Sequence, residues 1–155
     1  MDSIYTRPLE TFEWEVFRDF RLRALQASPG VFSSSYQEEA NTTPEEWQRT
    51  VRGPTHQVFG LFDREDLIGI TAVFTWRGDP SGETAVLAMS FIFPEYRGRG
   101  LSRLLYEARL GWIRSVGTFK RVVVSHRESN DVSRRAKPGT VFYRPGEHLA
   151  PGPME

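Results

Sequence analysis

One stretch decides the fold of this chain: Met89-Ser-Phe-Ile-Phe-Pro-Glu-Tyr-Arg-Gly-Arg-Gly-Leu-Ser-Arg-Leu-Leu105. Residues 84–93 are rich in apolar and β-favouring side chains, and Pro94 ends this run because proline has no N–H group to donate to a sheet. From Leu101 to Val116, apolar residues recur at helical spacing. The pattern predicts a strand, a turn of glycine and arginine, and an amphipathic helix that begins near Gly100.

The turn itself, Arg97-Gly-Arg-Gly100, has the properties of an anion site. Gly98 and Gly100 tolerate positive φ and let a ligand approach the backbone closely. The first turn of the helix leaves its N–H groups unpaired, and the helix dipole and two guanidinium groups favour negative charge there. We therefore expect a pyrophosphate site. The two glycines alone leave open an ordinary turn with two solvated arginines.

Other phosphate motifs fit this turn less well. A P-loop needs a lysine and a Ser or Thr directly after its last glycine, and a dinucleotide-binding motif needs a third glycine. Here Leu101-Ser-Arg103 follows instead. Both motifs also usually follow the first strand of a parallel sheet, whereas this turn follows the fourth extended segment.

The composition indicates a single domain with no macromolecular partner of strong charge. The chain has 155 residues, which is enough for one substantial core. Its 20 Lys and Arg balance 20 Asp and Glu, so no global field attracts nucleic acid or anionic membrane. The absence of cysteine excludes disulfides, thiolate catalysis and cysteine-ligated metals, and we expect no metal. No signal sequence or membrane-length apolar run is evident, so a cytoplasmic location is expected.

The remaining segments predict one mixed α/β domain. A second helix should begin at Pro44, with Thr43 as its N-cap. Alternating residues predict a hairpin on either side of Arg64-Glu-Asp66. The expected strands are 4–9, 57–63, 67–76, 84–93 and 121–125, and the first helix is expected over 11–26.

These residues together resemble the GNAT superfamily of acyl-CoA N-acyltransferases. The family signature is Arg or Gln, two residues, Gly, one residue, then Gly or Ala, and Arg97, Gly100 and Ser102 stand at those places. Ser102 departs slightly from this signature, because serine stands where the family has glycine or alanine. The likeness continues through a strand and helix that contain the family's asparagine, at Asn130, and covers about residues 3 to 136.

The resemblance implies a mixed, mostly antiparallel central sheet flanked by helices, in which the parallel fourth and fifth strands splay. It also implies transfer of an acetyl group from acetyl-CoA to a primary amine of a small molecule or peptide, by direct attack. An alternative of another class is a CoA-binding regulatory or degenerate module without turnover. Only the enzyme would release free thiol when an amine is present.

The cofactor-binding residues follow from the same resemblance. Pantetheine would bind to the main chain of Phe91, Ile92 and Phe93, whose aromatic side chains are expected in the core, and Asn130 would bond the pantetheine arm. An N-cap role for Asn130 is equally compatible with the sequence. The pyrophosphate would bind to Arg97, Gly98, Arg99, Gly100, Leu101 and Ser102.

Two residues are candidates for proton transfer. His126 follows the fifth strand, where an imidazole could take a proton from a bound ammonium through water, although a structural hydrogen bond is the alternative. Relatives place a tyrosine about two helical turns after the asparagine, but Lys137-Pro138 stands there. Tyr143 could protonate the leaving thiolate only if the C-terminal segment folds back. Glu128 is a further candidate, with a surface pair to Arg127 as its alternative.

Acceptor recognition is expected from residues 32–39, which combine hydroxyls, an aromatic ring and two acids. Ser34, Tyr36 and Glu39 are the candidate substrate-binding residues. The alternative is a polar connector that Phe32 and Tyr36 hold against the core.

The C-terminus departs from the family. The resemblance implies a continuing helix and a terminal hairpin after Ala136, but Lys137-Pro-Gly139 breaks the helix and residues 144–155 have the composition of coil. We expect a domain over 1–143 with one short strand at 140–143. Natural truncation, an edge supplied by a partner and a shifted reading frame remain open. An uncovered fifth strand would favour a homodimer or an aggregation-prone monomer.

Overall fold

The computed structural model of this chain describes residues 3–27, 36–125 and 140–143. They form one sheet with the strand order β1-β3-β4-β5-β6-β7, and β2 pairs with the start of β3. Every pair is antiparallel except β5 with β6. The strands are β1 (Ile4–Pro8), β2 (Arg52–Gly53), β3 (His56–Asp63), β4 (Asp66–Thr75), β5 (Thr84–Ile92), β6 (Arg121–Ser125) and β7 (Thr140–Tyr143).

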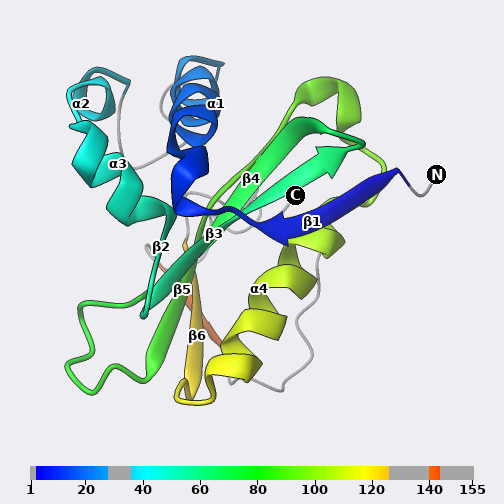
Figure 1. Cartoon of the computed structure of the whole chain (residues 1–155). Helices are drawn as coiled ribbons and strands as arrows, with labels where there is room; N and C mark the ends of the chain where they lie inside the picture. Colours follow the sequence, from blue (N-terminus) through cyan, green and yellow to red (C-terminus); the bar gives the residue numbers. More distant parts are fainter. Residues whose placement is uncertain (1–2, 28–35, 126–139, 144–155) are drawn as a thin grey trace.

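Helices cover both faces of the sheet (Figure 1). The helices are η1 (Thr11–Glu13), α1 (Trp14–Ala27), α2 (Tyr36–Ala40), α3 (Pro44–Val51), η2 (Pro94–Tyr96) and α4 (Ser102–Val116). One core cluster joins α1 and α3 to the β4 residues Ile70 and Ala72. Another joins α4 to Val73 of β4 and to β5 and β6. This alternation along β4 is the period-2 pattern of a strand that is buried on both faces, and the expected mixed, mostly antiparallel sheet is confirmed.

The local signals at the helix starts explain where α1 and α3 begin. Thr43 caps α3 as expected: its hydroxyl accepts the Glu46 N–H at 3.2 Å, and the Glu46 carboxylate accepts the Thr43 N–H at 3.1 Å. The first helix differs from the expectation of one continuous α-helix, because it opens with the 3₁₀ turn η1. The Glu13 carboxylate accepts the Glu10 N–H at 2.8 Å and pairs with Arg7, which stabilises this tighter start.

The parallel pairing of β5 with β6 is short, and the candidate site lies near the residues where this pairing ends. Their register runs from Thr84 opposite Arg121 to Leu87 opposite Val124, whereas β5 continues to Ile92. Between Ala88 and Phe91 the pairing with β4 shifts register, and Met89 has a φ of 65°. The second half of β5 is therefore paired with β4 and has no β6 partner within the described residues.

The strand β7 covers the outer edge of β6. Their antiparallel register runs from Val122 opposite Tyr143 to Ser125 opposite Thr140. The short strand expected at 140–143 is thus confirmed, but the expectation that the fifth strand lacks a neighbour is wrong. A homodimer was expected because this edge would be free, and β7 removes that reason. Residues 144–155, expected as coil, lie outside the described residues.

The described ranges were also compared with the requirements of a membrane-spanning helix and of a metal site. None of their helices combines the length and the apolar character that crossing a membrane requires. Within the same ranges, His, Asp and Glu side chains do not form a group of three that could hold a metal ion.

Candidate active site

The turn between β5 and α4 is open to solvent. Gly98 and Gly100 have φ values of 78° and 75°, a region that side chains with a Cβ rarely adopt. A Cβ added at either glycine would meet no atom within 4 Å. These glycines are thus required by the backbone conformation, and the space beside them is free for a ligand.

The main chain of this turn presents a row of N–H groups. The Arg97 N–H donates to Pro94 O at 3.1 Å, and the Arg103 N–H donates to Gly100 O at 3.3 Å. Between them, the N–H groups of residues 98–102 have no hydrogen-bond acceptor within the described part of the chain. The N-cap residue Leu101 offers no side-chain cap. Together with the helix dipole, these donors fit the pyrophosphate of acetyl-CoA.

Both arginines of the turn lie against aromatic rings. The Arg97 Nε donates to Ile92 O at 2.8 Å, and its guanidinium lies 4.9 Å from the centre of the Phe91 ring. The Arg99 guanidinium lies 5.1 Å from the centre of the Tyr96 ring. These contacts hold two positive charges at the turn. A pantetheine chain that bonded to the Ile92 carbonyl would share that oxygen with the Arg97 side chain or displace it.

A hydrogen-bond network anchors η2 beneath the turn. The Tyr96 hydroxyl donates to Asp63 Oδ2 at 3.0 Å, and the Ser3 hydroxyl donates to Oδ1 at 2.8 Å. The Ser3 hydroxyl, followed by that of Tyr96, lowers the pKa of Asp63, and the hydrogen bond to Asp63 raises the pKa of Tyr96. This network has no signal in the sequence, because no local spacing links Asp63 to a residue on another element.

The structure distinguishes among the three residues expected to bind pantetheine through the main chain. The Phe93 N–H donates to Ile68 O at 3.0 Å, so this residue bonds β4. Because the main-chain groups of a strand alternate in direction, those of Phe91 also face β4, whereas those of Ile92 face away from β4, beyond the last β5–β6 pair of the described residues. The Phe91 and Phe93 side chains pack with Phe20, at 6.1 and 4.7 Å between ring centres, which confirms their expected place in the core.

The acceptor candidates lie partly within the described residues. Tyr36 and Glu39 are on α2, where Tyr36 is exposed and Glu39 is paired with Arg21. Both Glu39 oxygens accept hydrogen bonds from the buried Arg21, at 2.9 and 3.0 Å. This ion pair joins α1 to α2, a structural role that the sequence did not indicate. Ser34 lies outside the described residues.

Two of the remaining candidates, His126 and Asn130, also lie outside the described residues. Tyr143 is in β7, and the register places it opposite Val122, two positions before Val124, where the pairing of β6 with β5 ends. The catalytic roles of His126 and Tyr143 and the pantetheine contact of Asn130 remain predictions.

Comparisons with known proteins agree with this arrangement. Residues 11–136 match the sequence profile of the acetyltransferase (GNAT) family. A search of curated proteins finds no match. Among solved structures, a GNAT-family acetyltransferase from Streptococcus pneumoniae has a TM-score of 0.65 at 18% identity, with 78% of this chain and 73% of that chain covered.

Two other solved structures have bound ligands. The PaiA N-acetyltransferase from Thermoplasma acidophilum, in complex with coenzyme A, has a TM-score of 0.62 at 21% identity, and 84% of each chain is covered. An aminoglycoside acetyltransferase from an uncultured soil metagenomic sample, in complex with sisomicin, has a TM-score of 0.60 at 14% identity, with 87% and 83% covered. At such identities the likeness shows the fold. The match over most of the chain shows the family: this protein belongs to the GNAT family of acetyltransferases.

Proposed function

We propose that this protein transfers the acetyl group of acetyl-CoA to a primary amine of a small molecule or peptide. The observation that carries the proposal is the row of N–H groups at residues 98–102 that have no acceptor in the described part of the chain. It lies beside the part of β5 after Leu87 that has no β6 partner among the described residues, and the space on that side of β5 is called the gap below. Pyrophosphate binds at the row, and pantetheine reaches into the gap. The coenzyme A complex of the Thermoplasma acidophilum protein supports this use of the fold.

The amine attacks directly. The chain has no cysteine, so no thiolate can accept the acetyl group first. One C–N bond forms and one C–S bond breaks, and the proton that the amine loses ends on the sulfur. His126 assists by taking the proton of the acceptor, and Tyr143 by supplying one to the sulfur. Both roles derive from positions in the sequence.

The main chain of Ile92 orients the donor. Its N–H and C=O groups face the gap, because the neighbouring residues Phe91 and Phe93 face β4. The Arg97 guanidinium, which bonds the Ile92 carbonyl at 2.8 Å, is freed when pantetheine takes that place. It then lies next to the pyrophosphate, where its charge is favourable.

Thiol release from acetyl-CoA tests the proposal. Purified protein, acetyl-CoA and a panel of amines that includes amino acids, peptide N-termini, polyamines and aminoglycosides should give steady release of free thiol with at least one amine. The sisomicin complex of the aminoglycoside acetyltransferase supports the inclusion of small amines in the panel. Binding of CoA without thiol release from any amine would contradict acetyl transfer and indicate a CoA-binding module.

A further inference from the structure

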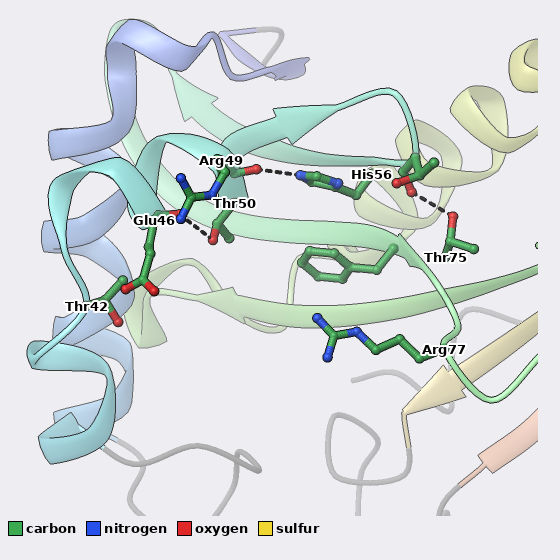
Figure 2. Close-up of a pocket in the computed structure, with 9 residues that line it drawn as sticks. Thr42, Glu46, Arg49, Thr50, His56, Thr75 and Arg77 are labelled. Atoms are coloured by element: carbon green, nitrogen blue, oxygen red, sulfur yellow. Dashed lines mark hydrogen bonds between the residues drawn. The ribbon is translucent and has the colours of Figure 1, made fainter.

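A hollow lies on the face of the sheet that carries α1 to α3. It has a volume of about 820 Å³, within the range of small-molecule sites. Figure 2 shows side chains from α3, the start of β3 and the end of β4 around it. Five lining residues carry the argument: Glu46, Arg49, His56, Phe74 and Arg77.

Two stacked rings form the apolar part of this hollow. The His56 and Phe74 rings are 5.7 Å apart at an interplanar angle of 23°, and both residues are half-buried. The His56 Nε2 lies 2.6 Å from Arg49 O, so Nε2 carries the proton and donates it to that carbonyl. The hydrogen bond fixes the ring over Phe74. A flat or extended hydrocarbon portion of a ligand can lie beside these rings.

The charged residues give the hollow a positive excess. Within the described residues, the guanidinium groups of Arg49 and Arg77 have neither a carboxylate partner nor a hydrogen-bond acceptor. Glu46 is the one carboxylate in the described lining, and it already accepts the Thr43 N–H at the start of α3. Two guanidinium groups against one carboxylate, all three on exposed residues, leave the lining with a net positive charge, which favours an anionic ligand over a polycation.

The hollow is also close to the gap where the donor is proposed to lie. Phe74 pairs with Val86, and Ala72 pairs with Ala88, the first β5 residue after the last β5–β6 pair. Ala72 is fully buried, but Val86 and Ala88, which lie on the same face of the sheet, are half-buried. Two residues along a strand span about 7 Å. A ligand beside Phe74 could therefore extend an amine of a few carbon atoms' length to the gap.

We propose that this hollow binds the acceptor, and that the acceptor is an amine with an anionic group several carbon atoms away. Arg49 and Arg77 hold the anionic group, the hydrocarbon portion lies beside His56 and Phe74, and the amine reaches the gap. The inference rests on the proposed acetyl transfer. It sets this chain apart from an enzyme for polyamines or aminoglycosides, whose acceptors carry only positive charge.

Matched acceptors test the charge preference. Benzylamine and 4-(aminomethyl)benzoate differ only in the carboxylate, and 6-aminohexanoate and 6-aminohexyl phosphate tell a carboxylate from a phosphate. Spermidine represents a polycation. We expect kcat/KM from thiol release to be at least about tenfold higher for 4-(aminomethyl)benzoate than for benzylamine, as expected for a charge-assisted hydrogen bond. A higher kcat/KM for benzylamine or spermidine than for 4-(aminomethyl)benzoate would contradict the proposal that this hollow binds an anionic acceptor.

Variants of Arg77 and Arg49 test whether the preference for an anionic acceptor arises in this hollow. Arg77→Gln and Arg49→Gln should each raise the KM for 4-(aminomethyl)benzoate about tenfold or more, with kcat and CoA affinity within about twofold. Benzylamine kinetics should not change. The control is Arg114→Gln, an exposed arginine on α4 at the other face, which should behave as the wild type. Unchanged KM in both pocket variants would overturn the assignment even if the enzyme is active.

A direct binding measurement separates this inference from the proposed function. Calorimetry of the CoA-bound protein should show saturable binding of 4-(aminomethyl)benzoate, and Arg77→Gln should weaken it. If no amine releases thiol, acetyl transfer fails, and weakened binding in the variant would still support an anion-binding pocket. Thiol release could also occur while Arg77→Gln leaves both the binding of 4-(aminomethyl)benzoate and its KM unchanged. That result would contradict the acceptor role of this hollow and leave the proposed acetyl transfer intact.

Discussion

The hydroxyl of Tyr96 donates a 3.0 Å hydrogen bond to Oδ2 of Asp63 at the end of β3, across 33 positions of the sequence. It ties the short helix η2 to the sheet immediately before the turn that presents its N–H groups. The position of those N–H groups therefore depends on a contact outside the turn itself.

Tyr96→Phe should weaken CoA binding without removing it. The change deletes one hydroxyl and leaves the ring against Arg99 in place. We expect a several-fold rise in the KM for acetyl-CoA with little change in kcat, because the turn loses an anchor and keeps its N–H groups. Tyr5→Phe is the control, since the Tyr5 hydroxyl bonds Arg64 O on the same hairpin and does not contact η2. Equal KM values in the two variants would show that the Asp63 contact does not position the turn.

The pair of Arg21 and Glu39 should stabilise the fold. The two side chains are 5% and 16% exposed, so loss of one partner leaves a charge with poor access to water. Glu39→Gln should lower the free energy of unfolding by about 2–4 kcal/mol. The exposed Glu15→Gln on α1 should change it by less than about 0.5 kcal/mol. Denaturant unfolding measures both. A stable Glu39→Gln protein with a raised acceptor KM would instead return Glu39 to the substrate-binding role.

The Asp79 carboxylate should make stability depend on pH at acid values. It accepts hydrogen bonds from the Ser81 and Thr84 hydroxyls, both at 2.6 Å, and from Arg121 at 2.7 Å, and its pKa is lowered chiefly by Ser81. A lowered folded-state pKa gives stabilisation that is complete above the unfolded value of about 3.9 and is lost as the pH falls through the folded pKa.

Thermal unfolding of Asp79→Asn checks that dependence. The variant should unfold at a lower temperature than the wild type at neutral pH, and the difference should shrink as the pH falls below about 4. Asp19→Asn removes a pair whose carboxylate is 66% exposed and should show little effect at either pH. A constant difference across the pH range would mean that the carboxylate charge of Asp79 contributes nothing.

His126→Ala should separate catalysis from binding. If His126 takes the acceptor proton, its loss should lower turnover by about 10²–10⁴-fold and leave CoA affinity nearly intact. Retention of more than about half of the turnover at neutral pH would make His126 structural, and the base would then be a water chain or another carboxylate.

The elements that were predicted correctly have their signals in neighbouring residues. Pro94, the two glycines and the helical spacing after Leu101 locate β5, the turn and α4. The pair of Thr43 and Glu46 locates the start of α3 in the same way. Such signals act within a few residues of the chain, so a single sequence contains them.

The features that were missed depend on contacts between distant residues. Asp63 with Tyr96 and Arg21 with Glu39 form only when separate elements pack, and polar residues at those positions also fit a solvated surface. The short strand at 140–143 was predicted, but its pairing with β6 was not, because that pairing joins residues on either side of a proline and glycine break. The hollow lined by Arg49 and Arg77 requires α3, β3 and β4 together.

Calorimetry with CoA on a pair of glycine variants tests the central claim most directly. Gly100 and Gly82 have φ values of 75° and 74°, and a Cβ added at either meets no atom within 4 Å. Gly100→Asp and Gly82→Asp therefore impose similar backbone strain, but only the first puts a carboxylate beside the N–H groups of residues 98–102. We predict that folded Gly100→Asp loses CoA binding and that Gly82→Asp binds as the wild type does. Wild-type CoA affinity in a folded Gly100→Asp protein would contradict the site.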